Sequence, residues 1–151
     1  MTTEERELRR ELHELAETDN GRRLLQLALR GIDGGEAELT AGCWTDRGIA
    51  GCLFQHAYWQ GVREGIFRDE GRPGDWIGSF VGSSDYATVL NAIGSFDRLA
   101  KRHHADRMPR RILPDKIEIR TGEWRQVVER MLVEALADSQ DPAPARNPVP
   151  A

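Results

Sequence analysis

Residues 49–67 of the sequence are IAGCLFQHAYWQGVREGIF. The segment contains no proline, and only Arg63 and Glu64 in it carry full charge. Its apolar side chains fall on several sides of a helix, which is typical of a helix surrounded by others. We therefore predict that 49–67 is the longest helix and the centre of the fold. Three glycines interrupt it: Gly51, Gly61 and Gly65. Each costs about 1 kcal/mol relative to alanine in a helix interior, so they indicate places where a backbone or a ligand comes close.

Other segments show apolar residues at the spacing of an amphipathic helix. They are residues 3–17, 21–31, 84–103 and 122–137, with a shorter helical or irregular segment at 76–81. Thr2-x-x-Glu5 is a capping-box pattern at the start of the first helix. The connection between the first two helices is so short that we expect them to form an antiparallel hairpin.

The sequence therefore predicts an all-α fold, a single domain of about five helices over residues 1–138. Ile117 and Ile119 also allow a very short strand near 116–120. Residues 139–151 contain four prolines and almost nothing to bury, so we expect a disordered, Pro-rich tail.

The chain shows no sign of export or of membrane insertion. Its N-terminus is polar and acidic, without the apolar segment of a secretory signal. No run of 18 uninterrupted apolar residues is present, so we expect no transmembrane span. We expect a cytoplasmic protein, in which the two cysteines, Cys43 and Cys52, are thiols.

The charge pattern argues against nucleic acid as a partner. The formal net charge is -4, which attracts neither nucleic acid nor an anionic membrane surface. The basic run 101–111 has no interleaved aromatic residue to stack on bases. Basic residues at the end of a helix also complement the helix dipole. We therefore expect no nucleic-acid binding.

Cys52 and His56 suggest a metal site, since residues i and i+4 share one face of a helix. Cys43 from the preceding loop and His103 or His104 would complete a tetrahedral Cys2His2 set suited to zinc. The same cysteine and histidine could instead form a nucleophile and base, or the two cysteines a redox disulfide. The simpler alternative is that Cys52 is a small buried hydrophobe and that His56 bonds a neighbour.

Aromatic residues concentrate between residues 44 and 80. With the polar residues among them they could line a small-molecule pocket or a homodimer face. The candidate binding residues are Trp44, His56, Tyr58, Trp59, Arg63 and Trp76. The alternative is that the aromatics only fill the core.

The sequence contains no P-loop, no G-x-S-x-G, no H-E-x-x-H and no C-x-x-C pair. We therefore favour a non-enzymatic binding or interaction module that uses residues 44–80. The alternative is a zinc-dependent or thiol-based enzyme or sensor that uses Cys43, Cys52 and His56.

Overall fold

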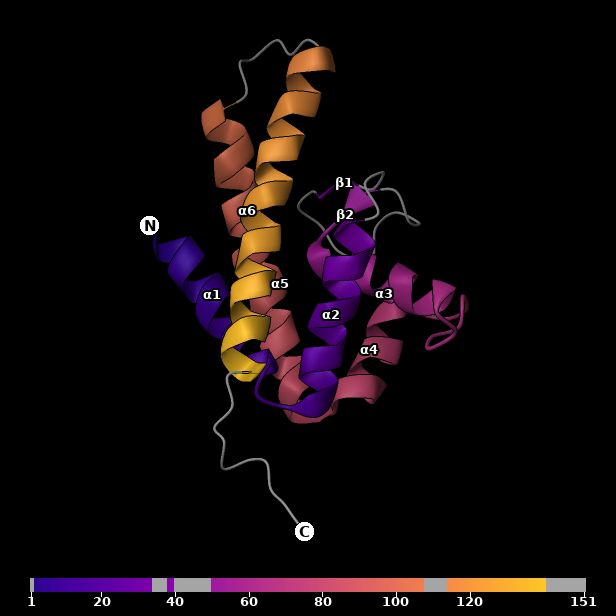
Figure 1. The fold of residues 1–151 in the computed structure, drawn as a ribbon. Helices are drawn as coiled ribbons and strands as arrows, with labels where there is room; N and C mark the ends of the chain where they lie inside the picture. The colour runs from indigo at the N-terminus through magenta and orange to yellow at the C-terminus, as the bar shows by residue number, and fades with distance from the viewer. Residues whose placement is uncertain (1, 34–37, 40–49, 108–113, 141–151) are drawn as a thin grey trace.

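The structure, a computed structural model, describes residues 2–33, 38–39, 50–107 and 114–140, with side chains for 2–33, 39, 51–102 and 124–138. This part of the chain folds into six helices and one pair of two-residue strands (Figure 1). In chain order they are α1 (Thr3–Leu15), α2 (Asp19–Asp33), β1 (Glu38–Leu39), β2 (Ala50–Gly51), α3 (Leu53–Arg63), α4 (Pro73–Val81), α5 (Ser83–Arg107) and α6 (Pro114–Gln140). The all-α prediction is confirmed, and the segment near 76–81 is a helix in its own right.

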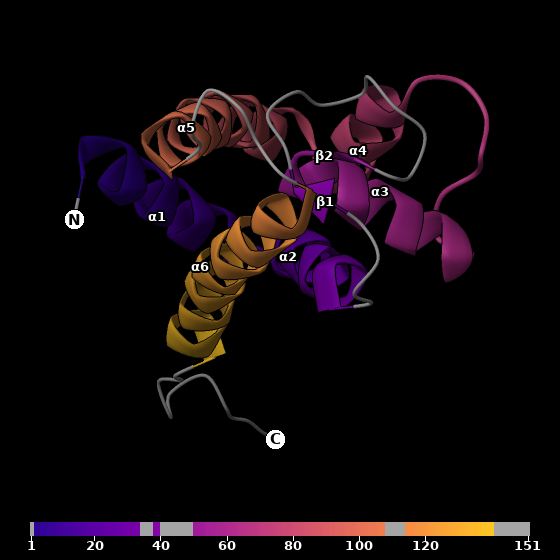
Figure 2. The same cartoon turned by 90° about the horizontal axis from the view of Figure 1, so that it is seen from above.

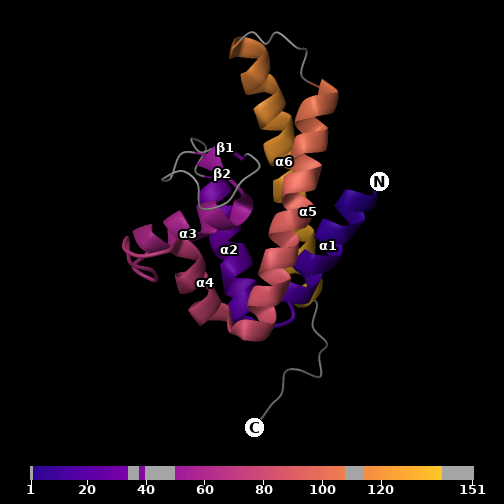
Figure 3. The ribbon, with the colours of Figure 1, turned by 180° about the vertical axis from the view of Figure 1, so that it is seen from behind.

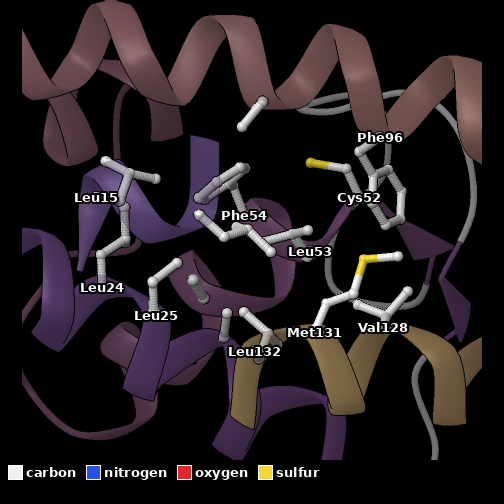
Figure 4. Close-up of a cluster of buried hydrophobic side chains, with 14 of the residues drawn as sticks. Leu15, Leu24, Leu25, Cys52, Leu53, Phe54, Phe96, Val128, Met131 and Leu132 are labelled. Atoms are coloured by element: carbon white, nitrogen blue, oxygen red, sulfur yellow. The ribbon is translucent and has the colours of Figure 1, made fainter. Parts of the chain in front are cut away.

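Helix α3 lies at the centre of the fold, as its composition predicts. Every residue from Leu53 to Tyr58 is buried. Figure 4 shows Leu53 and Phe54 among side chains of α1, α2, α5 and α6. With 11 residues, however, α3 is far shorter than α5 and α6. The prediction that the central helix is the longest is therefore wrong.

The start of α3 is four residues later than predicted. Ala50 and Gly51 are extended, and they pair in parallel with Glu38 and Leu39. A strand pair uses the backbone groups that a helix would need for its own ladder, so the helix begins only at Leu53.

The end of α3 is a Schellman motif. The N–H of Gly65 donates to the carbonyl oxygen of Val62 (3.1 Å), and the N–H of Ile66 donates to that of Gly61 (2.8 Å). Gly65 has a φ of 79°, which favours glycine because it lacks a Cβ. The helix therefore ends at Arg63 and does not reach residue 67.

Helices α2 and α3 make the most extensive contact between elements in this part of the chain. A Cβ built at Gly31 would lie 2.6 Å from the carbonyl oxygen of His56 and 3.1 Å from its carbonyl carbon. Only a residue without a side chain fits such a distance. Gly31 therefore allows the two backbones to touch.

Helix α1 begins at the predicted cap, where the Thr2 hydroxyl accepts a hydrogen bond from the Glu5 N–H (3.2 Å). The closely packed hairpin of α1 and α2 is not found. The two helices contact each other little, and α1 packs chiefly on α5 and α6. Figure 2 shows α1 running between α5 and α6. Leu8, Leu12 and Leu15 of α1 are fully buried. A short connection keeps the joined ends of two helices close together. It does not decide which other helices cover their apolar faces.

Helices α5 and α6 are longer than predicted (Figure 3). Because α6 begins at Pro114, residues 116–120 are helical and the predicted short strand is wrong. Proline suits the first position of a helix, and the sheet within the described residues consists of β1 and β2 alone. Residues 139–140 continue α6, whereas the rest of the predicted tail, 141–151, lies outside the described residues. None of the helices within the described ranges has the length and hydropathy needed to cross a bilayer.

We predict that Gly31→Ala destabilises the protein by about 1–3 kcal/mol, the usual cost of overpacking. The new methyl group would collide with the His56 carbonyl, so α2 and α3 would have to separate. Urea denaturation measures the change.

Gly94→Ala in α5 is the matched control. Its Cβ would meet only the flexible end of Arg98 at 3.4 Å. The higher helix propensity of alanine should leave this variant as stable as the wild type or more so. Equal stabilities for the two variants would contradict the close contact at Gly31.

Candidate functional site

Cys52 caps the N-terminus of α3. Its backbone is extended (φ -75°, ψ 173°), and its carbonyl oxygen accepts hydrogen bonds from the N–H groups of Gln55 (3.1 Å) and His56 (3.3 Å). The side chain is fully buried. Figure 4 shows it beside Phe96 of α5, in the cluster that includes Met131 of α6. Cys52 and His56, which we predicted as metal ligands or as a nucleophile and its base, therefore both lie inside the core.

Cys52 is disulfide-bonded. The only other cysteine of the sequence is Cys43, which lies outside the described residues. The expectation that Cys52 is a free thiol is therefore wrong. A sulfur atom in a disulfide has no thiolate to offer a metal or a substrate, so in this state Cys52 is neither a zinc ligand nor a nucleophile.

Of the remaining predicted zinc ligands, the described part contains only the side chain of His56. No three His, Cys, Asp or Glu side chains there lie close enough to hold a metal ion. His56 is buried, with 2% of its surface exposed. Cys43 and the side chains of His103 and His104 lie outside the described residues. The full zinc set thus stays a prediction.

Aromatic side chains of α3, of α4 and of the segment between them form a continuous chain of ring contacts. Trp59 meets Tyr58 edge-on (centroids 5.0 Å apart), Tyr58 stacks on Phe67 (5.7 Å), and Phe67 meets Phe80 edge-on (5.4 Å). Tyr58 is buried, and its hydroxyl donates to the carbonyl oxygen of Arg68. Tyr58 is therefore a core residue rather than a ligand-facing one.

Two of the predicted binding tryptophans keep part of their surface in solvent. Trp59 and Trp76 are half-buried, and the Trp76 Nε1–H donates to the carbonyl oxygen of Glu70 (2.6 Å). Arg63 is exposed, and its guanidinium donates to Gln60 Oε1 (2.8 and 3.2 Å). Of the remaining candidates, His56 and Tyr58 lie in the core and Trp44 lies outside the described residues. The surface candidates are thus reduced to three residues.

A polar network joins the C-terminal ends of α2 and α3. Arg30 donates to both carboxylate oxygens of Glu64 (2.8 and 2.9 Å), and the Gln60 amide donates to Glu64 as well (2.7 Å). The hydrogen bond from Arg30 holds the pKa of Glu64 below its ordinary value, and the bond to Glu64 raises the pKa of Arg30. No sequence pattern indicates this pair, because its members are 34 residues apart. The network is exposed and contributes little stability.

Glu11 of α1 is a buried carboxyl group that the sequence reasoning did not single out. Only 7% of the residue is exposed, and burial is the main cause that raises its pKa. The position of Glu11 in the sequence could have indicated that it is buried. Glu11 follows Leu8 by three residues and precedes Leu15 by four, so it lies on the apolar face of α1.

Comparison of the chain with protein-family models, with curated proteins and with solved structures gave no match. Function is therefore argued from the residues alone.

We predict that the denatured, unreduced protein contains no reactive thiol and that reduction releases two per chain. Thiol titration in denaturant measures both numbers. Reduction should also lower the free energy of unfolding by about 2–3 kcal/mol, as expected when a short loop is no longer closed.

A Cys43→Ser, Cys52→Ser double variant is the control, because its stability should not respond to the reducing agent. Two reactive thiols before reduction would show that the bond does not form in solution.

Proposed function

We propose that this chain is a small, non-enzymatic interaction module that pairs with a second copy of itself through the surface of α3 and α4. The observation that carries the proposal is the half-buried state of Trp59 and Trp76 on these neighbouring helices. Tryptophan is enriched where proteins meet, since it buries a large area and keeps a polar handle.

The apolar side chains around these tryptophans support an extended contact surface. Val62, Ile66 and Phe80 are only partly buried. Phe80 and Trp59 are the two ends of the chain of ring contacts, so the core holds the surface rings in place. A contact surface that is already rigid loses little conformational entropy on binding.

The charges beside this surface favour a second copy over a strongly charged partner. The segment between α3 and α4 and the first turn of α4 expose both signs: Arg68, Asp69, Glu70, Arg72 and Asp75. In a two-fold symmetric dimer the two copies contact each other through the same patch, and a residue of one copy can face a different residue of the other copy. A patch of mixed sign can therefore form opposite-charge contacts with its own copy.

The alternative function, a zinc-dependent or thiol-based enzyme or sensor, has less support. It requires thiolates, whereas Cys52 is disulfide-bonded. It also requires several ligands around one point, and the described residues hold no such group.

We predict that the wild-type chain self-associates in a concentration-dependent way and that Arg72→Glu weakens the association. The charge reversal removes one complementary contact and creates a like-charge one, typically a several-fold loss in affinity. Sedimentation velocity over a concentration series measures it. Trp59→Ala should weaken the association further. If the Trp59→Ala variant folds poorly, Arg72→Glu still tests the proposal.

Leu90→Ala is the control, because Leu90 is 49% exposed on α5, outside the proposed surface. Its association should match that of the wild type. A wild-type chain that stays monomeric at its highest soluble concentration would refute the proposal, as would equal effects of Leu90→Ala and Arg72→Glu.

A further inference from the structure

Helix α1 is held in place mainly by parts of the chain that are distant from it in sequence. It packs chiefly on α5 and α6, and it contacts α2, the next helix along the chain, much less. Figure 2 shows α1 between α5 and α6. Because Leu8, Leu12 and Leu15 of α1 are fully buried, a helix that takes the place of α1 must present an apolar seam.

The two edges of α1 carry polar groups that match those of its neighbours. Glu4 and Glu7 pair with cations of α5, whereas Arg9 and His13 contact carboxylates of α6. In the described part of the chain the pairs are Glu4–Arg102 (3.1 Å), Glu7–Arg98 (3.2 Å), Arg9–Glu134 and His13–Asp138 (2.8 Å). Residues three or four apart share one side of a helix. The surface formed by α5 and α6 therefore selects a helix with an acidic edge and an opposite edge of hydrogen-bond donors.

Glu11 adds a polar contact in the middle of this face. Only 7% of the residue is exposed, and its carboxyl group makes a hydrogen bond with Ser95 of α5, which is fully buried. Buried polar groups in folded proteins are hydrogen-bonded, so a shift of α1 along α5 would leave both groups without this partner. The contact favours the observed register of α1.

A second copy of the chain carries a helix with this same seam, the same edges and the same register. When two copies exchange an identical element, each contact of that element is kept but is made with the other chain. Only the connection between α1 and α2 has to change its conformation.

The connection between α1 and α2 is short and has no residue that resists helix formation. Helix α1 ends at Leu15 and α2 begins at Asp19, and residues 16–18 include neither proline nor glycine. The backbone of Ala16 (φ -69°, ψ -9°) already lies in the right-handed helical region. When the connection opens, α1 and α2 can therefore join in one continuous helix, which carries α1 away from its own α5 and α6.

Gly21 of α2 allows the connection to close. A Cβ built at Gly21 would lie 1.9 Å from the carbonyl oxygen of Leu15 and 2.7 Å from the hydroxyl oxygen of Thr18, and the Gly21 N–H donates to that hydroxyl (3.1 Å). In a continuous helix, residues 15 and 21 would be about 9 Å apart along the axis, so the collision would be absent. A side chain at position 21 therefore disfavours the closed connection and not the open one.

We propose that two copies of this chain exchange their α1 helices, so that each α1 binds the α5–α6 surface of the other copy. Short hinge segments are where such exchange arises. The contact is separate from the α3–α4 surface proposed above and does not depend on it. The matched charges set the direction and register of the bound helix more than its affinity.

An exchange of charges tests which chain each α1 binds. One variant carries Glu4→Arg and Glu7→Arg, and the other carries Arg98→Glu and Arg102→Glu. Within either variant α1 meets like charges on α5, whereas a heterodimer with exchanged helices restores opposite charges at both contacts. After the two are unfolded, mixed equally and refolded, we expect heterodimers to exceed the two homodimers together about tenfold. Native mass spectrometry measures the ratio, and pairing at random gives equal amounts.

Gly21→Ala is a second, independent test. Its methyl group blocks the closed connection, and alanine favours the continuous helix. After refolding at high concentration, we expect the dimer fraction to rise about tenfold over that of the wild type, in line with the cost of overpacking the closed form. The dimer should dissociate slowly on dilution in size-exclusion chromatography, because α1 must leave its binding surface. Gly94→Ala is the control and should match the wild type.

A heterodimer yield no higher than random pairing would overturn the proposal, as would a Gly21→Ala variant that dimerises no more than Gly94→Ala. If either double variant fails to fold, the single changes Glu7→Arg and Arg98→Glu repeat the comparison. An α3–α4 contact adds equally to every pairing of the variants. A wild-type chain without that contact would therefore still show the heterodimer preference, and the two proposals fail separately.

Discussion

The backbone contact between Gly31 of α2 and the carbonyl group of His56 in α3 is the constraint on which the arrangement of the other helices depends. It sets the distance between the two helices that contact each other most. With α3 held this close, its remaining faces carry Leu53 and Phe54 toward α5 and α6 (Figure 4). The bonded sulfur of Cys52 adds a covalent restraint at the start of the same helix. Packing and covalent chemistry thus fix one short helix, and the longer helices assemble around it.

Helix α1 is held by a different balance of forces. Its leucines contribute burial, but its inner face also contains Glu11, and its flanks carry ion pairs to two helices. Hydrophobic burial is nearly independent of pH, whereas charged contacts are not. The fold therefore combines a centre held by backbone contact between α2 and α3 with one helix whose attachment also includes charged side chains.

The central helix could be predicted from the sequence because six consecutive buried positions require a segment that is apolar on all sides. The two ends of this helix were harder to predict than its central position. The start depends on pairing of residues 50–51 with residues 38–39. No local sequence pattern indicates this contact between two separate segments. The end was readable in principle, since Gly65 followed by Ile66 suits a Schellman motif. A disulfide was only an alternative to free thiols in the interpretation of the sequence, because the argument from compartment gives only an average expectation for cysteines.

The candidate site shows why a concentration of aromatic residues overstates a binding surface. Successive helical residues point about 100° apart, so Tyr58 lies in the core while its neighbour Trp59 reaches the surface. The same periodicity buries His56 and exposes Arg63. Of the aromatic residues that suggested a ligand pocket, Phe54, Tyr58 and Phe67 are buried in the core. What remains is a partly apolar surface with charges of both signs beside it, and such a surface suits contact with another protein chain better than enclosure of a small molecule.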